Sequence, residues 1–317
     1  MNTQHETPKT LMEAVRYFAD PDIAQSFFVQ IRWPNGVCCP TCGSVKVSYL
    51  ANQRRWQCSS RHPKRQFSAK VGTIFEDSAL GLDKWLVAFW LETSAKNSIS
   101  SYEVARHLGI TQKSAWFMLH RIRTSLKNGS LEKLSGTIEA DETFLGGKLQ
   151  NMHKKRADRV RRNRKDHGKA AVFGMLQRGG EVRTMVLPAV DNANIHPQIR
   201  TNVEPGSNLF TDNWGGYRGL STEYFHRFVD HSFEYVRGNV HTNSLENFWA
   251  LFKRCVKGTH VTIEPFHLFR YLDAECFRFN NRKTDDGGRF MKALPGVIGK
   301  RLTYRNLIGG DSLVPIS

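Results

Sequence analysis

The stretch Ile138-Glu-Ala-Asp-Glu-Thr-Phe144 decides the fold class of this chain. Its composition and pattern are those of a β-strand. Other stretches downstream have strand character or helical spacing. The expected strands are Thr137–Phe144, Ala170–Gln177, Glu181–Val190 and Asn208–Thr211, and the expected helices are Asn213–Leu220 and Leu245–Val256. Several strands followed by alternating strands and helices predict an α/β domain with a mixed sheet over residues 135–283.

Three acidic residues stand where these elements begin or end. Asp141 lies in the first strand, Asp212 ends the strand Leu209-Phe-Thr-Asp, and Glu246 begins an amphipathic helix. If the carboxylates converge at one edge of the sheet, they can hold a pair of Mg²⁺ ions, which prefer hard oxygen ligands. Two such ions favour in-line phosphoryl transfer. Each acid taken alone could instead be a helix cap or a surface charge.

A lysine follows the third acid on the same helix. Lys253 comes seven residues after Glu246, which is two helical turns on the same face. A cation there can bind a DNA phosphate beside the metal ions, and Arg254 and Lys257 extend the basic patch. A solvated surface lysine is the alternative.

Four of the six cysteines lie close together near the N-terminus. The spacing Cys39-x2-Cys42, then fifteen residues, then Cys58-x3-His62 is typical of a structural zinc site with Cys3His ligands. Cys38 is an alternative fourth ligand. The remaining cysteines, Cys255 and Cys276, are expected to be buried thiols, and the alternative for the whole group is a set of ordinary reduced thiols.

Residues 101–123 have the pattern of a helix-turn-helix, with Gly109 at the turn and Thr111 as the cap of the second helix. The exposed face of the second helix is expected to offer a set of polar and basic side chains to DNA. These are Gln112, Lys113, His120, Arg121 and Arg123. The same periodicity would also make an ordinary helical hairpin.

The charge of the chain points to a nucleic-acid partner. The 317 residues include 46 Lys+Arg against 29 Asp+Glu, a net charge of +17, and a polyphosphate rewards clustered cations through counterion release. The stretch Lys148–Lys169 alone holds ten basic residues and two Asp. We expect Arg159, Arg161, Arg162 and Arg164 in this stretch to contact DNA, with a merely solubilising loop as the alternative.

The composition excludes a wholly disordered chain, because 40% of the residues are hydrophobic. The longest apolar run, Trp85–Leu91, is too short to cross a bilayer. We therefore expect a cytoplasmic protein with no membrane partner. The expected segments are a helical lead (1–30), a zinc ribbon (31–75), a helix-turn-helix region (76–130), the α/β domain (135–283) and a C-terminal tail (284–317).

Several motifs, taken in their order along the chain, resemble the ISXO-like transposases, which are bacterial insertion-sequence enzymes of the DDE class. They include the Cys-Pro-x-Cys-Gly ribbon, Gly72-Thr-Ile-Phe-Glu-Asp-Ser78, Asp141-Glu-Thr-Phe-Leu-Gly-Gly147, His241-Thr-Asn-Ser-Leu-Glu246 and Arg278-Phe-Asn-Asn-Arg282. The resemblance implies an RNase H-like catalytic core that uses Mg²⁺ or Mn²⁺. It implies an enzyme that cuts at the element ends and joins the freed 3′-hydroxyls to target DNA.

Carried over by position, the resemblance gives Asp141, Asp212 and Glu246 as the acid triad and Lys253 as the associated basic residue. Related enzymes can carry Asn in place of the third acid, so Asn243 is an alternative to Glu246. Glu142 is an alternative to Asp141, since a shift of one residue exchanges the faces of a strand.

The resulting interpretation is a transposase that acts on double-stranded DNA, both element ends and target. We expect it to form a homo-oligomer on DNA and to associate with the bacterial nucleoid. A non-catalytic DNA-binding regulator is the alternative from another class, and it would leave the acids without a role. A nuclease that cuts without joining is a third interpretation.

Overall fold

A computed structural model of the chain describes residues 7–126, 132–146, 154, 158, 169–212, 215–229 and 240–309. The chain divides into two compact units. The first, called here the N-terminal unit, comprises residues 1–127 together with 283–317, and the second, called the sheet unit, comprises residues 128–282.

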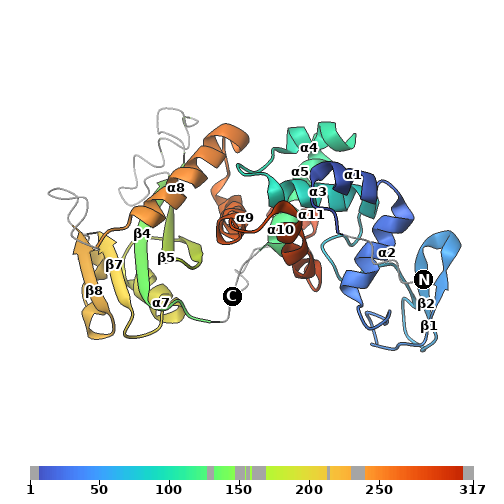
Figure 1. Ribbon diagram of the computed structural model, residues 1–317, viewed down its shortest axis with the longest axis horizontal. Coiled ribbons are helices and arrows are strands. Elements are labelled where there is room, and N and C mark those ends of the chain that lie inside the picture. The colour runs from blue at the N-terminus through green and yellow to red at the C-terminus, as the bar shows by residue number, and fades with distance from the viewer. Residues whose placement is uncertain are drawn as a thin grey trace. The chain divides into compact units, whose positions relative to one another are not determined.

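The sheet unit is built on five strands in the order β6-β5-β4-β7-β8. Figure 1 labels β8, β7, β4 and β5 of this sheet. They are β4 (Thr137–Leu145), β5 (Ala170–Gln177), β6 (Val182–Leu187), β7 (Asn208–Asp212) and β8 (Phe225–Val229). β4 pairs antiparallel with β5, and β5 with β6. β7 pairs parallel with β4 and with β8. The expectation of an α/β domain with a mixed sheet is confirmed.

Helices cover both faces of this sheet (Figure 1). They are α7 (Asn192–Asn202), α8 (Asn243–Cys255) and α9 (Leu268–Asn280), with short helical turns at Gly215–Tyr217, Leu220–Thr222, Val256–His260 and Pro265–His267. On one face, Ile138 and Ala140 of β4 pack with Ile195 of α7. On the other face, Val172 of β5 packs with Leu245 of α8. Side chains alternate along a strand, so odd-numbered positions of β4 face α8 and even-numbered positions face α7.

The four expected strands are present, with β6 ending earlier than expected, at Leu187. The expected helix Asn213–Leu220 is wrong for the residues that are described, 215–220. They form two separate 3₁₀ turns, because Gly219 between them has a φ of +97°, which a right-handed helix cannot include. β8 and α7 were not expected, and α7 contains Pro197, which weakens its helical signal.

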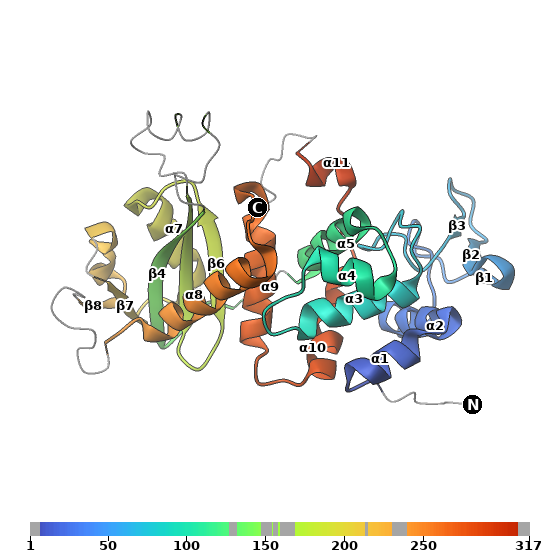
Figure 2. The same cartoon turned by 90° about the horizontal axis from the view of Figure 1, so that it is seen from above.

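The N-terminal unit combines helices with a small sheet (Figure 2). The helices are α1 (Leu11–Phe18), α2 (Pro21–Arg32), α3 (Leu82–Ser94), α4 (Ser101–Leu108), α5 (Gln112–Ser125), α10 (Asp286–Ala293) and α11 (Tyr304–Leu307), with 3₁₀ turns at Ala51–Gln53 and Leu294–Val297. The antiparallel sheet consists of β1 (Val47–Leu50), β2 (Arg55–Cys58) and β3 (Gln66–Phe67). Trp56 of β2 and Phe67 of β3 stack with ring centroids 6.0 Å apart and give this sheet an apolar side.

The expectation of a C-terminal tail from residue 284 is wrong. Phe290 of α10 is fully buried and packs against Phe18 of α1 and Trp90 of α3, with ring centroids 5.7 Å and 5.1 Å apart. The backbone of Ile74 donates to the carbonyl of Val297 at 3.1 Å. This segment is therefore part of the core of the N-terminal unit, a contact that a linear reading of the sequence cannot show.

The segment 101–125 forms two helices joined by a tight turn, as its pattern predicts. Ser100 and Glu103 form a capping box at the start of α4, and Gly109 ends α4 with a φ of +59°. Thr111 caps α5 by accepting from the N–H of Ser114. Among the residues described, no helix is long and apolar enough to cross a membrane.

Candidate metal centres and nucleic-acid contacts

Two of the predicted acids meet where strands β4 and β7 stop pairing. The last paired residues are Glu139 of β4 and Phe210 of β7, and Asp141 and Asp212 each come two residues later. The carboxylates of Asp141, Asp212 and Glu142 offer oxygens that lie within 4.8 Å of one another. Hard oxygens at this separation suit a divalent cation such as Mg²⁺. These three carboxylates therefore fit a divalent cation such as Mg²⁺.

The neighbours Asp141 and Glu142 are held from opposite faces of the sheet. The indole Nε1 of Trp249 in α8 donates to Oδ2 of Asp141 at 3.1 Å. The hydroxyl of Tyr217, which lies on the α7 side, donates to Oε1 of Glu142 at 2.6 Å. Although successive side chains point to opposite faces, both carboxylates reach the same point at the edge of the sheet.

The acids disfavour one another's ionisation. Burial raises the pKa of Asp141 to about 6, and the charges of Asp212 and Glu246 add to the shift. Burial likewise raises the pKa of Glu142 to about 7, with further contributions from Asp212 and Asp141 that the hydrogen bond from Tyr217 partly offsets. A site that concentrates negative charge in this way favours a bound cation.

Glu246 lies in the first turn of α8, exposed, and its Oε1 accepts from the hydroxyl of Thr242 at 2.9 Å. Its charge acts on Asp141, but it falls outside the group of described acids that lie within 4.8 Å of one another. Asn243, one turn earlier, and Lys253, two turns later, are also exposed on α8. The structure thus brings Asp141, Asp212 and the alternative Glu142 together and places Glu246 at their margin.

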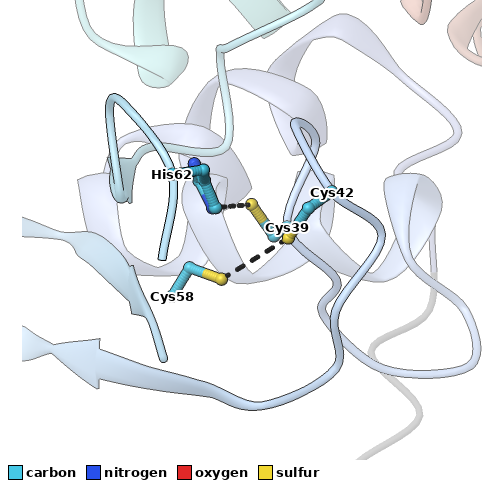
Figure 3. Close-up of side chains that lie close together, drawn as sticks. All are labelled: Cys39, Cys42, Cys58 and His62. Carbon is cyan, nitrogen blue, oxygen red and sulfur yellow. Dashed lines mark hydrogen bonds between the residues drawn. The ribbon is translucent and has the colours of Figure 1, made fainter. Parts of the chain in front are cut away.

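The predicted zinc ligands converge in the N-terminal unit (Figure 3). Cys39, Cys42, Cys58 and His62 offer ligand atoms within 4.8 Å of one another, and Cys38 is not in this group. Cys42 Sγ lies 3.7 Å from Cys58 Sγ, and Cys39 Sγ lies 3.4 Å from His62 Nε2. Zn–S bonds of about 2.3 Å in a tetrahedron place sulfur atoms about 3.8 Å apart. The geometry is that of a Cys3His site for Zn²⁺.

Hydrogen bonds prepare these ligands for a metal. His62 Nδ1 lies 2.6 Å from the carbonyl of Pro63, which can only accept, so Nδ1 carries the proton and Nε2 is left to coordinate. Burial opposes ionisation of Cys58, but hydrogen bonds to its sulfur outweigh it and lower the pKa of Cys58 to about 6. Gly43, with a φ of +71°, allows the tight turn after Cys42.

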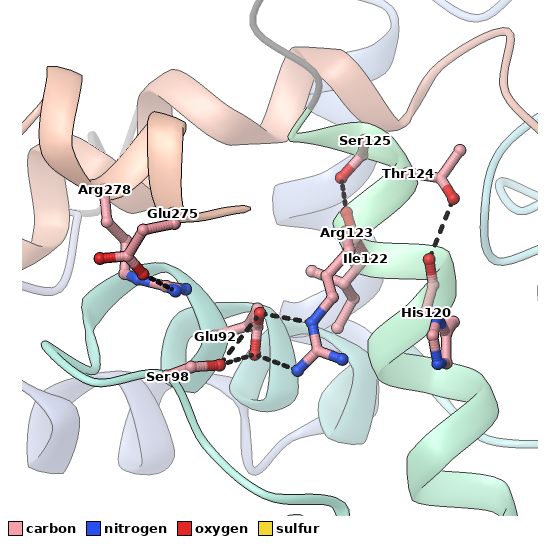
Figure 4. Close-up of polar contacts among 9 residues, drawn as sticks. All are labelled: Glu92, Ser98, His120, Ile122, Arg123, Thr124, Ser125, Glu275 and Arg278. Carbon is pink, nitrogen blue, oxygen red and sulfur yellow. Dashed lines mark hydrogen bonds and ion pairs between the residues drawn. The ribbon is translucent and has the colours of Figure 1, made fainter. Parts of the chain in front are cut away.

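The prediction that the whole polar face of α5 is exposed to DNA is wrong for three residues. His120, Arg121 and Arg123 are buried, with exposures of 0%, 3% and 2%. Arg123 pairs with Glu92 of α3 at 2.8 Å, and Ser98 also donates to Glu92 (Figure 4). Arg121 donates to the carbonyl of Glu76 and lies over the ring of Trp85. The second half of α5 is covered on more than one side. Its basic residues therefore make contacts inside the N-terminal unit and are not available to DNA.

The other predicted DNA contacts have different outcomes. Gln112 donates to the hydroxyl of Ser101 at 2.9 Å, and Lys113 is exposed with its ammonium over the ring of Tyr304 at 4.8 Å. Lys253 and Arg254 are exposed on α8. The stretch around Arg159, Arg161, Arg162 and Arg164 lies outside the described residues.

Tyr217 and Trp249 belong to the acid site and were not predicted. Trp249 lies on the apolar face of α8, where its spacing indicates only core packing, but a buried indole N–H needs a hydrogen-bond partner. Tyr217 comes five residues after Asp212, in a stretch without regular periodicity. Only the fold brings its hydroxyl to Glu142.

The chain thus combines a mixed α/β unit that gathers carboxylates with an N-terminal unit that gathers Cys3His ligands. Residues 133–280 match the ISXO2-like transposase domain, and residues 20–60 match the transposase zinc-ribbon domain. The chain belongs to the ISXO2-like transposase family, as its motifs indicated.

Two relatives carry matching descriptions. One, from Halobacterium salinarum, is an uncharacterized protein in transposable element ISH50, 26% identical over 276 residues that span 83% of this chain and 92% of the relative. The other, an uncharacterized transposase-like protein of Haemophilus influenzae, is 33% identical over 116 residues, 36% of this chain and 93% of the relative.

Proposed function

We propose that this transposase cuts at the ends of its element and joins the freed 3′-hydroxyls to target DNA, with Asp141, Asp212 and Glu246 as ligands of divalent metal. The observation that carries the proposal is the approach of Asp141 and Asp212 within 4.8 Å, from two adjacent parallel strands. A non-catalytic regulator would have no reason to gather half-buried acids whose charges repel one another.

The strand arrangement supports an RNase H-like core. Three antiparallel strands, β4 to β6, are followed by α7 and then by β7 and β8, which run parallel to β4. Asp141 on the central strand and Asp212 on its neighbour then lie at the edge where such a core would bind metal. Glu246 on α8 approaches from the helix that covers this part of the sheet.

The residues of the site have separable tasks in this proposal. Mg²⁺ or Mn²⁺ bound by the acids would activate the attacking oxygen and stabilise the leaving one. Trp249 holds one carboxylate oxygen of Asp141, and Tyr217 holds one of Glu142. Lys253, exposed two turns beyond Glu246, would bind a DNA phosphate beside the acids.

Glu142 enters the proposal as a further ligand or a replacement for Glu246. Its oxygen lies inside the group that includes Asp141 and Asp212, whereas Glu246 lies outside that group. A cation would draw an exposed carboxylate such as that of Glu246 toward the cluster by charge alone. Asn243, exposed one turn earlier, remains the alternative third ligand.

DNA binding is proposed for several surfaces. The zinc ribbon and the pair α4–α5, acting as a helix-turn-helix, would bind the element ends, with Gln112 and Lys113 at the start of α5 as contacts. Lys253 and Arg254 would bind the DNA that is being cut. The basic residues Arg159, Arg161, Arg162 and Arg164 are proposed to add phosphate contacts on the grounds of their charge alone.

A homo-oligomer on DNA is part of the proposal, because two element ends must be processed together. The proposed substrate is double-stranded DNA. We therefore also propose that the protein acts in the cytoplasm, on the DNA of the nucleoid.

The test is a strand-transfer assay with pre-cut element ends and Mg²⁺ or Mn²⁺. Asp141→Asn and Asp212→Asn should abolish cutting and joining, because each removes a charged oxygen ligand. Binding to the ends should be equal or slightly tighter, since a carboxylate repels phosphate. Glu246→Gln should be as severe, and Asn243→Ala should be milder.

The assay also separates the alternatives. Glu246→Gln with near-normal joining while Asn243→Ala is inactive would give the third position to Asn243. Cutting without joining would identify a nuclease. Full activity in Asp141→Asn would mean that the proposed metal site takes no part in the reaction.

A further inference from the structure

A fully buried carboxylate precedes Asp141 by two residues on the same strand. Glu139 of β4 is 0% exposed and accepts from the backbone N–H groups of Ser244 at 2.9 Å and Leu245 at 3.0 Å. It also accepts from the Ser244 hydroxyl at 3.0 Å. These amides lie in the first turn of α8, where N–H groups lack the usual partner one turn back. The amide of Leu245 also donates to the carbonyl of Thr242 at 3.0 Å, whereas Glu139 is the acceptor for the amide of Ser244. Glu139 therefore caps α8 from the neighbouring strand.

The residue that would ordinarily cap α8 has another contact. Thr242 precedes the helix, but its side chain accepts no capping hydrogen bond, and its hydroxyl donates to Glu246. The start of α8 thus depends on β4 for its cap. A carboxylate is the strongest acceptor for this role, because the helix N-terminus carries partial positive charge.

Arg178, which follows β5, balances the charge of Glu139. Its Nε donates to Glu139 at 2.7 Å, and its Nη2 donates to the carbonyl of His241 at 2.9 Å. The guanidinium also lies 5.0 Å from the ring centroid of Phe210 in β7. One side chain therefore joins β4, β7 and the chain segment just before α8.

The contacts form a layer directly below the acids. Glu139 precedes Asp141 by two residues, Phe210 precedes Asp212 by two, and Ser244 precedes Glu246 by two. On a strand, residues two apart lie on the same face. Glu139 and Phe210 therefore share strand faces with Asp141 and Asp212, whereas Ser244 shares only the first turn of α8 with Glu246. The network touches each element that carries a predicted acid.

Helix α8 is fastened to β4 at two points. Glu139 binds the amides of Ser244 and Leu245, and Asp141 binds the indole of Trp249. Glu246 lies between these points in the sequence of the helix. The backbone of Glu246 is thus held relative to Asp141 by both attachments.

We propose that Glu139 and Arg178 form a latch that fixes the start of α8 and so sets the position of Glu246 relative to Asp141 and Asp212. Both are positioning residues, and their part in metal binding rests on the function proposed above. An ion pair between a buried carboxylate and a half-buried arginine is a weak means of stabilising a fold, since well-packed apolar residues do as well. Its placement below the acids gives it a use that an apolar pair could not supply, the cap of α8.

The experiment uses the full, zinc-loaded chain and two readouts. Hydrogen exchange in peptides over 240–250 reports the start of α8, and Mn²⁺ titration followed by electron paramagnetic resonance reports the acid site. Glu139→Ala should speed exchange there and weaken Mn²⁺ binding about 10- to 100-fold, the range found for residues that support metal ligands. Glu139→Gln keeps an acceptor oxygen and should recover part of both losses.

A matched control separates positioning from general stability. Glu275 and Arg278 form a buried pair within α9, 2.5 Å apart, on a helix that carries none of the predicted acids. Glu275→Gln should lower the melting temperature of the sheet unit as Glu139→Gln does, and leave Mn²⁺ affinity unchanged. Equal losses of Mn²⁺ affinity in both variants would overturn the proposal.

Two further results would overturn it. The first is wild-type exchange over 240–250 in Glu139→Ala. The second is unchanged Mn²⁺ affinity in that variant when Asp141→Asn abolishes binding. If Asp141→Asn leaves Mn²⁺ binding intact, the proposed metal site is what has failed. The latch is then decided by hydrogen exchange alone.

Discussion

Asp141 and Glu142 are adjacent carboxylates whose environments make them harder to ionise than in an unfolded chain. Their pKa values are raised to about 6 and about 7, against about 4 for the unfolded residues. Between these limits the folded state binds more protons than the unfolded state. The free energy of unfolding should therefore rise as the pH falls through this range.

We predict that the free energy of unfolding of the zinc-loaded protein, without Mg²⁺ or Mn²⁺, increases as the pH is lowered from 7.5 to 5.5. Each unit of pKa shift corresponds to about 1.4 kcal/mol at full effect. Urea titrations of the sheet unit's transition at several pH values would measure it. The double variant Asp141→Asn/Glu142→Gln should lose this slope, and a slope equal to wild type would contradict the assignment.

Arg123 provides a second test of a single residue, because it was expected to contact DNA and is buried against Glu92. Arg123→Ala leaves a buried carboxylate without its partner and should destabilise the N-terminal unit by about 3–5 kcal/mol. Lys113→Ala, at an exposed position, should leave stability unchanged and weaken DNA binding with a smaller salt slope.

Urea unfolding measures the stability of the Arg123→Ala and Lys113→Ala variants. DNA titration at several salt concentrations measures their affinity and its salt slope. Arg54→Ala serves as a control, since its pair with Asp22 is exposed and should matter little to stability. A stable Arg123→Ala variant that loses only DNA affinity would return Arg123 to the DNA interface.

At the scale of elements, α8 lies so close to β5 that one strand position must be glycine. Gly174 pairs with Asp141, and a Cβ there would lie 2.5 Å from Trp249 Cζ2. Gly174→Ala should push Trp249, and with it the indole that binds Asp141, away from the sheet. We expect a lower melting temperature of the sheet unit and weaker Mn²⁺ binding.

The control for this variant is Gly258→Ala, where an added Cβ meets nothing within 4 Å. Calorimetry and Mn²⁺ titration should show little change in that variant. If Gly174→Ala behaves like Gly258→Ala, α8 can shift without effect on the acid site.

The sequence could predict the helices and strands better than it could predict the contacts between them. Strand composition found β4, β5 and β7, and ligand spacing found all four zinc residues, because these signals are local. It misassigned Arg121 and Arg123 because helical periodicity shows which residues share a face but not that a second face is covered. It could not relate Glu142 to Tyr217, a contact between residues 75 positions apart.

At the scale of the whole molecule, the N-terminal unit is discontinuous in sequence. Its core is completed by Phe290, from the far side of the sheet unit in the chain. Phe290→Ala should destabilise this unit by about 3–5 kcal/mol, the usual cost of removing a buried ring. Hydrogen exchange should rise in α1 and α3, which contact Phe290.

The sheet unit is the internal control for this variant. Exchange in β4 and β5 should stay as in wild type, since Phe290 belongs to the other unit. Faster exchange in all elements alike would mean that the two units unfold as one.

This discontinuity sets an order of events on the ribosome. Domains generally fold as units during synthesis, N-terminal first, but here residues 1–127 lack part of their own core until residue 290 has been made. The sheet unit, complete at residue 282, is available to fold earlier. A product that terminates between these positions would have its acids assembled while the unit bearing its zinc ribbon is still unfinished. Premature termination between residues 282 and 290 would thus leave the earlier-encoded unit without part of its core.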